Sequence, residues 1–396
     1  MTVSDRSTPT RRRAGLYIHI PFCSAICPYC DFAVTTGSSG QHSRYVDRLV
    51  SEIELYRGYP LIFDTVYFGG GTPSALEPEG LERILEALRH SLDVATDAWI
   101  SIEANPEDID VASLAAWRDL GCKTVSLGVQ SFDDAELKFL GRRHDRGVSI
   151  SSVQAALAAG FEVVSIDLIY GLPASFVRTN SQGAWRRNLE EAINLRPDHV
   201  SCYQLTIHEG TPFARYQDKG RLEELPNREQ AEAFDLTHEM LEAGGYEAYE
   251  VSNFARSPAH RSRHNQRYWN HTPYLGLGLS AHSYDNGRRW WNERQLSRYE
   301  ERVAAGEKPV AGSEDLSQSD LALETVMLGL RTRRGVDLTA FEERFGVDLQ
   351  AENADLIRKY VTEGIAVEDT RVLRLTRKGF ATADAVARDL RLPGVS

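Results

Sequence analysis

The chain has 396 residues, of which 42% are hydrophobic and 26% charged, so it can bury a substantial core in two or three domains. Its 57 Asp and Glu residues outnumber 45 Lys and Arg residues, and the formal net charge of −12 argues against nucleic acid as a partner. No run approaches the roughly 20 apolar residues of a membrane-spanning helix. Five cysteines, three of them clustered, do not resemble a secreted disulfide framework. We therefore expect a cytoplasmic protein without a transmembrane segment, and leave open a homodimer and a peripheral position at a membrane.

The first two thirds of the chain predict repeated β/α units. After a polar tail, residues 1–14, spacings of about 25 to 50 residues separate short β-branched or aromatic runs, which suits parallel strands joined by helices. The six runs are residues 16–20, 65–68, 99–103, 124–129, 163–168 and 199–205. Residues 15–245 are therefore predicted to form an α/β fold, a partial (β/α)6 barrel of the TIM type, with its chemistry at the C-terminal ends of the strands.

The remaining third has a different character. Residues 246–301 form an extension rich in His, Asn, Trp and Tyr, and residues 302–315 are a charged segment that we interpret as a linker. Within the extension, "GLGLSA" matches the dinucleotide-binding pattern, but it lacks a βαβ context and is expected to be a tight turn. Residues 316–396 predict helices followed by a two-stranded wing, a small winged-helix-like α+β domain. Its role as a DNA-binding module is disfavoured because no basic recognition helix is evident.

Three cysteines directly follow the first predicted strand. Cys23, Cys27 and Cys30 are spaced C-x3-C-x2-C in "HIPFCSAICPYCDF". A structural zinc site needs four ligands, usually from two C-x2-C pairs, so zinc is the second interpretation. Three thiolates can hold three irons of a [4Fe-4S] cluster and leave the fourth iron open. This spacing resembles the signature of the radical S-adenosylmethionine (SAM) superfamily, in which the open iron binds SAM.

Five motifs in order carry a closer resemblance: "YIHIPFCSAICPYCDF", "YFGGGTPS", "EANPEDI", "SLGVQSFDDAELKFLGRRH" and "SIDLIYGLP". They resemble the oxygen-independent coproporphyrinogen III oxidases and their relatives, from about residue 15 to the C-terminus. The resemblance implies that SAM lies between tyrosines, with its methionine part on glycines and its ribose, carboxylate and adenine on polar strand ends. The implied residues are Tyr17 and Tyr29; Gly70, Gly71 and Thr72; Glu103, Gln130 and Arg142; and Asp167. Read alone, each polar residue could equally be a helix cap or a surface residue.

Two departures point away from the oxidases. Oxidases continue the cysteine motif as Cys-Gly-Cys and carry a long N-terminal segment, whereas Asp31 and Phe32 follow Cys30 and 22 residues precede Cys23. Both features resemble the sister family, the heme chaperone HemW. That family also carries an H-N-x-x-Y-W motif, matched here by "HNQRYW" at residues 264–269.

The resemblance implies a protein that binds a [4Fe-4S] cluster and SAM, carries heme as cargo and delivers it to acceptor hemoproteins. An oxidase that decarboxylates propionate side chains is the alternative; we leave open whether the chain is an enzyme and expect no coproporphyrinogen oxidase activity. His264 is the predicted heme contact, because an imidazole beside Tyr268 and Trp269 suits a porphyrin. A purely structural His264 is the competing interpretation, and His260, His271 and His282 are further available ligands.

Overall fold

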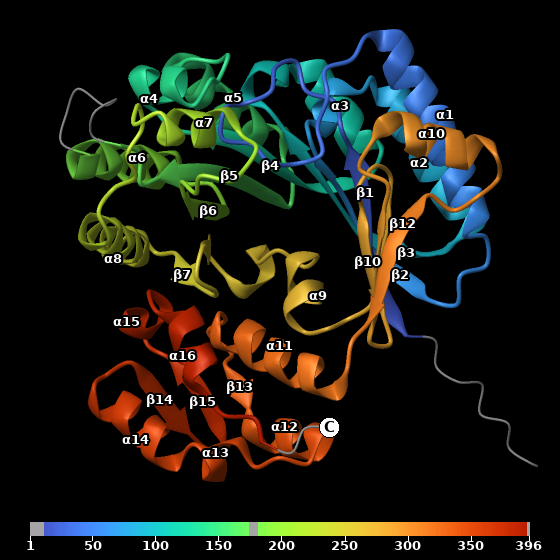
Figure 1. Ribbon diagram of the computed structural model, residues 1–396. Helices are drawn as coiled ribbons and strands as arrows, with labels where there is room; N and C mark the ends of the chain where they lie inside the picture. The colour runs from blue at the N-terminus through green and yellow to red at the C-terminus, as the bar shows by residue number, and fades with distance from the viewer. Residues whose placement is uncertain (1–11, 174–180, 394–396) are drawn as a thin grey trace, which may run out of the picture.

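Six parallel strands form the centre of the computed structural model, which describes residues 12–173 and 181–393. Residues 1–11 of the predicted tail lie outside this description, and the first strand begins at Arg13. The strands pair in sequence order and curve into a partial barrel (Figure 1). They are β1 (Arg13–Ile20), β2 (Ile62–Gly70), β3 (Asp93–Ala104), β4 (Cys122–Gln130), β5 (Val163–Tyr170) and β6 (His199–Gln204). The structure confirms the predicted fold class.

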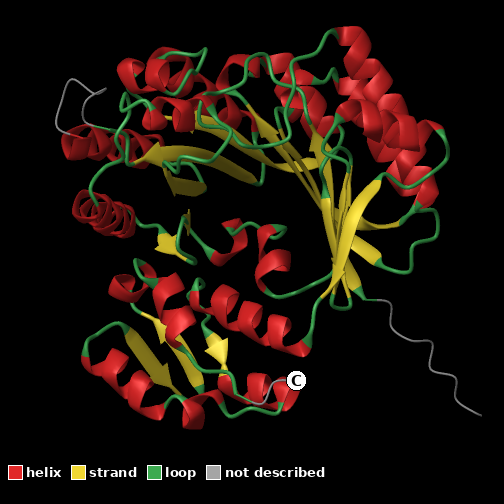
Figure 2. Cartoon of the chain, in the orientation of Figure 1, coloured by secondary structure: helices red, strands yellow, loops and turns green. Residues whose placement is uncertain are grey.

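Helices cover the outer face of this barrel (Figure 2). In α2, Leu81, Ile84, Leu85 and Leu88 recur at three- to four-residue spacing and are all buried against the sheet, as an amphipathic helix requires. Pro78 occupies its first turn, where the missing N–H has no partner to lose. The helices of this part are α1 (Ser39–Leu55), α2 (Pro78–Ser91), α3 (Val111–Asp119), α4 (Asp134–Phe139), α5 (Arg146–Ala159), α6 (Ser181–Leu195), α7 (Pro212–Asp218) and α8 (Asn227–Ala243).

The barrel does not close, because additional strands pair with both of its edges. Next to β6 lie β8 (Asn253–Ala255) and β7 (Glu247–Ala248), both antiparallel to their neighbours. Next to β1 lie, in order, β9 (Tyr274–Leu277), β10 (His282–Asp285), β11 (Arg288–Asn292) and β12 (Val310–Asp315). The segment also contains α9 (Asn265–Trp269) and α10 (Leu296–Ala304).

The interpretation of residues 302–315 as a linker needs correction. Residues 302–304 end α10, and β12 pairs with β11 along its length. Its alternating exposure and acidic end are typical of an edge strand, in which charged side chains discourage pairing with other chains. Charge alone therefore did not distinguish a linker from an edge strand.

A buried carboxylate attaches this extension to the barrel. Glu52 on α1 accepts hydrogen bonds from the Gly278 N–H (2.7 Å), Asn292 Nδ2 (2.7 Å) and Tyr299 OH (2.8 Å). Residues 278–281 of "GLGLSA" form the predicted turn between β9 and β10, whereas residues 276 and 277 end β9. A Cβ at Gly278 would lie 2.6 Å from the carbonyl oxygen of His19, so the turn is fixed against the end of β1.

Glu52 predicts a specific pH dependence of stability. Burial raises its pKa to about 7, so between about pH 4.5 and 7 the folded chain retains a proton that the unfolded chain has released, and stability falls as the pH rises. We expect the free energy of unfolding of the wild type to drop by about 2 to 3 kcal/mol more between pH 5 and 8 than that of Glu52→Gln. Urea unfolding at the two pH values measures this difference. Glu82→Gln, on the exposed face of α2, is the control, and equal pH slopes for all three proteins would contradict the assignment.

The C-terminal domain packs around a second buried core, which Phe234 of α8 also joins. Figure 1 shows it below the barrel, with α9 and β7 lying between the two. Its elements are α11 (Gln318–Leu330), β13 (Val336–Asp337), α12 (Leu338–Phe345), α13 (Leu349–Glu352), α14 (Ala354–Thr362), β14 (Ala366–Asp369), β15 (Val372–Leu375), α15 (Arg377–Phe380) and α16 (Ala383–Asp389). The antiparallel sheet β13-β15-β14 beside these helices agrees with the predicted α+β wing. Within the described residues, no helix of either part is long and apolar enough to cross a membrane.

Candidate functional site

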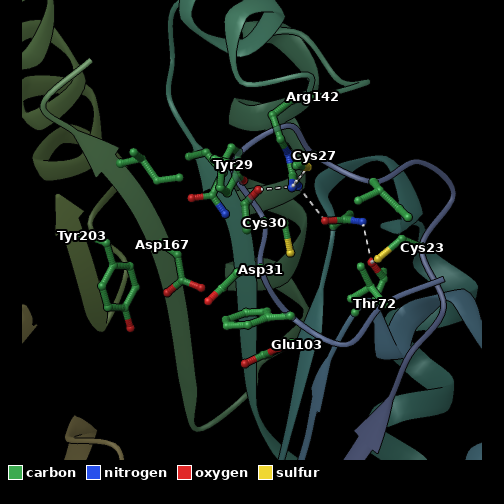
Figure 3. Close-up of a pocket in the computed structure, with 18 of the residues that line it drawn as sticks. Cys23, Cys27, Tyr29, Cys30, Asp31, Thr72, Glu103, Arg142, Asp167 and Tyr203 are labelled. Atoms are coloured by element: carbon green, nitrogen blue, oxygen red, sulfur yellow. Dashed lines mark hydrogen bonds between the residues drawn. The ribbon is translucent and has the colours of Figure 1, made fainter. Parts of the chain in front are cut away.

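The three clustered cysteines lie in the loop that follows β1. This loop returns to its own start, because the Thr35 N–H donates to the Pro21 carbonyl (2.8 Å) and the Cys23 N–H donates to the Thr35 carbonyl (2.9 Å). Cys23, Cys27 and Cys30 are each partly exposed and free of disulfides. All three line one cavity at the C-terminal ends of the strands (Figure 3).

This cavity, of about 450 Å³, has the size of a small-molecule site. Eleven of the thirteen predicted site residues line it, although they come from five of the six barrel strands or the loops that follow them. The eleven are Cys23, Cys27, Tyr29, Cys30, Gly70, Gly71, Thr72, Glu103, Gln130, Arg142 and Asp167. Tyr17 and His264 are not among the lining residues.

A chain of hydrogen bonds connects two of the thiols across the cavity wall. Thr72 Oγ1 donates to Cys23 Sγ (3.6 Å) and accepts from Asn105 Nδ2 (3.1 Å). Arg142 donates from Nη2 to Asn105 Oδ1 (2.6 Å) and from Nη1 to Cys27 Sγ (3.6 Å). Figure 3 shows this chain as dashed lines beside the cysteine loop. It fixes two thiols relative to the ends of β2 and β3.

The donor set fits a [4Fe-4S] cluster. Burial raises the pKa of the Cys23 thiol, and that of the Cys30 thiol to about 11, so these thiols stay protonated until a metal displaces the proton. Arg142 Nε is buried without a hydrogen-bond partner among the described residues. Because Arg142 lines the cavity, this N–H is a free donor beside the cysteine loop. No three His, Cys, Asp or Glu side chains of the described ranges converge on a point that could hold one metal ion. A cluster does not need such convergence, because each thiolate binds a different iron.

Two glycines let the end of β2 approach the cysteine loop. Gly70 has a φ of +115°, and a Cβ there would lie 2.6 Å from the ring of His19. A Cβ at Gly71 would lie 2.8 Å from backbone atoms of Pro21 and Phe22. Because real Cβ atoms do not approach backbone atoms this closely, any side chain at Gly71 must displace the start of the cysteine loop.

Two carboxyl groups face the cavity from β3 and β5. Burial raises the pKa of Glu103 to about 7 and that of Asp167 to about 6. Hydrogen bonds limit both shifts: Tyr67 OH donates to Glu103 Oε1 (2.6 Å), and Ser201 and Ser126 bond to Asp167. Near neutral pH each group can therefore change between a hydrogen-bond acceptor and a donor, a property that is common at functional sites.

The structure places Tyr17 beneath the cavity wall. Its ring stacks on Tyr67 at a centroid distance of 6.3 Å, and its hydroxyl lies 3.2 Å from His19 Nδ1. Tyr67 in turn bonds Glu103, which lines the cavity. The role of Tyr17 as a contact of SAM stays a prediction.

His264 is likewise not brought to the cavity. It is 3% exposed, with Nδ1 lying 3.1 Å from Thr65 Oγ1 and Nε2 lying 2.8 Å from Tyr268 OH. Burial lowers its pKa to about 3. Both ring nitrogens are therefore engaged, and this geometry agrees with the structural interpretation of His264 and does not support it as a heme contact.

Several residues at the cavity were absent from the predicted set. Asn105 belongs to the same "EANP" motif as Glu103, two residues further along. Tyr203, 43% exposed, lies near the end of β6 and His208 follows that strand. His208 Nδ1 lies 3.5 Å from Asp31 Oδ2, so the loop after β6 meets the cysteine loop. The rule that sites form at the ends of parallel strands could have found the β6 residues.

Known proteins resemble the chain over nearly its whole length. The family model of the Radical SAM superfamily matches residues 17–176, and that of the HemN C-terminal domain matches residues 316–381. The heme chaperone HemW of Synechocystis sp. is 39% identical over 81% of this chain and 78% of its own length. The heme chaperone HemW of Mycobacterium tuberculosis is 37% identical over 95% of this chain and 94% of its own length. The chain belongs to the HemW family.

A solved structure supports the fold of this HemW-family member. Coproporphyrinogen III oxidase (HemN) from Escherichia coli superposes with a TM-score of 0.80 over 96% of this chain and 90% of its own, at 24% sequence identity. At this identity the likeness shows a shared fold and not a shared reaction. Membership of the radical SAM superfamily implies a [4Fe-4S] cluster and SAM as cofactors.

Proposed function

We propose that this protein is a heme chaperone, which binds a [4Fe-4S] cluster, SAM and heme and delivers the heme to acceptor hemoproteins. The observation that carries the proposal is the three-thiol cavity in a chain whose full-length relatives are named heme chaperones. Acceptor hemoproteins are the implied partners.

The cavity supplies a place for both cofactors. Cys23, Cys27 and Cys30 would hold three irons of the cluster, and the fourth iron would be open to SAM. A bound cluster with SAM supplies one-electron chemistry. The backbone at Gly70 and Gly71 would lie against the methionine part, and the remaining predicted residues would surround the rest of SAM. These residues are Tyr29, Thr72, Glu103, Gln130, Arg142 and Asp167.

The protein's own contribution is to hold and shield these groups. Arg142 would keep Cys27 in place and add positive charge beside the thiolates, which offsets part of their mutual repulsion. Glu103 and Asp167 would bond hydroxyl groups of SAM inside a wall that excludes bulk water. Tyr17 and Tyr67 would fix the Glu103 carboxyl group from behind.

The residues after Cys30 favour the chaperone over the oxidase. The Asp31 carbonyl accepts a hydrogen bond from Arg294 Nη2 (2.6 Å), and the Asp31 carboxylate lies beside His208. Phe32, at the position where the oxidases carry their next cysteine, is 63% exposed at the cavity. This site therefore offers a bulky apolar surface where an oxidase has a thiol.

Heme transfer tests the proposal. We expect the anaerobically reconstituted protein to bind heme and to load a heme-depleted b-type cytochrome faster than free heme does, as followed by the absorbance of the cytochrome. A heme-loaded serum albumin at the same heme concentration is the control for nonspecific release. Absence of heme binding under reducing, anaerobic conditions would overturn the proposal.

A further inference from the structure

A heme ligand needs an imidazole that is accessible, neutral and not already bonded. The chain has eleven histidines. Seven imidazoles make hydrogen bonds with described residues, and the rings of two more lie within 4 Å of a carboxylate: His208 is 3.5 Å from Asp31, and His260 is 3.8 Å from Asp198. The seven are His19, His42, His144, His199, His238, His264 and His271. Among the described residues, only the imidazoles of His90 and His282 have neither kind of contact.

These two histidines differ in their surroundings. His90 is exposed in the last turn of α2, on the outer layer of helices. His282 is exposed at the start of β10, opposite Trp291 of β11. Its ring stacks on the indole at a centroid distance of 5.9 Å and an interplanar angle of 28°. His282 is thus the exposed, unpaired histidine that also has a fixed ring orientation.

The strand pairing shows why Trp291 lies flat against this histidine. Trp290, its neighbour in sequence, packs into the core on the opposite face of the sheet, so Trp291 points away from the helices. On its other side Trp291 pairs with Gly312 of β12, where a Cβ would lie 2.5 Å from the indole ring. Glycine at this position leaves room for the indole and so supports the stacking on His282.

The surroundings of His282 favour a neutral imidazole, the form that can bind a metal. Partial burial and the positive charge of Arg289 lower the pKa of His282, and Glu314 only partly opposes them. The ring is therefore neutral at pH 7 and retains a lone pair for a metal. Arg294, two residues after the end of β11, donates a hydrogen bond to the carbonyl of Asp31. The segment after the strand that carries Trp291 therefore contacts the cysteine loop.

We propose that His282 is an axial ligand of the heme iron and that Trp291 orients its imidazole. This inference rests on the proposed function and deepens it, because it assigns the heme to the exposed face of the β10–β11–β12 sheet. The exposed imidazole of His282 would supply the ligand nitrogen, and the stacked indole of Trp291 would hold that ring in place. His264, with both nitrogens engaged, is then a structural residue.

Heme titration of matched histidine variants tests this assignment. Difference spectra against heme-free reconstituted protein separate the heme bands from the cluster absorbance. We expect His282→Ala to weaken heme binding at least about tenfold and to lose the spectrum of histidine-ligated heme, which free imidazole in the buffer restores. His90→Ala is the control and is expected to bind as the wild type does. Trp291→Leu is expected to keep the ligation with a smaller loss of affinity.

The outcomes separate the assignment from the proposed function. Wild-type affinity and an unchanged spectrum in His282→Ala would overturn the assignment and leave the heme chaperone intact. A wild-type protein that binds no heme would overturn both. Cluster absorbance equal to that of the wild type shows that a variant has folded.

Discussion

Cys27→Ser is expected to abolish assembly of the [4Fe-4S] cluster and to leave the chain folded. A serine hydroxyl is a harder and less acidic ligand than a thiol, so it binds iron of the cluster poorly. The fold survives because Cys27 lies in a partly exposed loop and contributes nothing to the buried core of the barrel. Anaerobic reconstitution, with iron and sulfide analysis and the visible absorbance of the cluster, measures the loss.

The control for this variant is another cysteine of the same chain. Cys122 is buried at the start of β4, away from the cavity, so Cys122→Ala should assemble the cluster at a modest cost in stability. Full cluster content in Cys27→Ser would contradict the assignment of the ligands. Global unfolding of that variant, seen by circular dichroism, would contradict the independence of the fold from the loop.

Gly71→Ala is expected to weaken SAM binding by about 10- to 100-fold, the usual cost of disturbing residues that position a metal site. The added Cβ would lie 2.8 Å from backbone atoms of Pro21 and Phe22. Backbone atoms cannot rotate out of the way as a flexible side chain can, so the chain itself must shift. The displacement reaches Cys23, the next residue along the chain. Equilibrium binding of SAM, expressed per cluster, measures the effect.

Gly40→Ala is the matched control for this second substitution. Gly40 lies in α1, and apart from its chain neighbours and the backbone of its own helix, no described residue has an atom within 4 Å of a Cβ placed there. The alanine should leave SAM binding unchanged and slightly stabilise the helix. Equal SAM affinity in Gly71→Ala and Gly40→Ala would show that the close approach of β2 to the cysteine loop does not matter for the cofactor.

Much of the fold and of the cavity could be predicted from the sequence. Buried parallel strands read as continuous β-branched runs, so β1 to β6 were evident as separate units. Residues at their C-terminal ends must meet at one edge of the sheet, which explains why Gly70, Glu103 and Asp167 share a cavity with the cysteine loop.

Contacts that depend on the curvature of the barrel could not be predicted in this way. Asn105 joins Thr72 to Arg142 because the ends of β2, β3 and β4 converge at a particular angle, and no pattern in the sequence encodes that angle. His264 looked like a ligand because of its aromatic neighbours. Its burial depends on how residues 260–270 cross below the barrel, which only the tertiary structure reveals.

We propose that this protein delivers heme and does not oxidise porphyrinogens. The most direct test divides one anaerobically reconstituted sample, supplied with SAM and a reductant, between heme and coproporphyrinogen III. We predict binding and transfer of heme in the first half and no protoporphyrinogen in the second. Formation of protoporphyrinogen, with no binding of heme, would contradict the proposal that this protein is a heme chaperone.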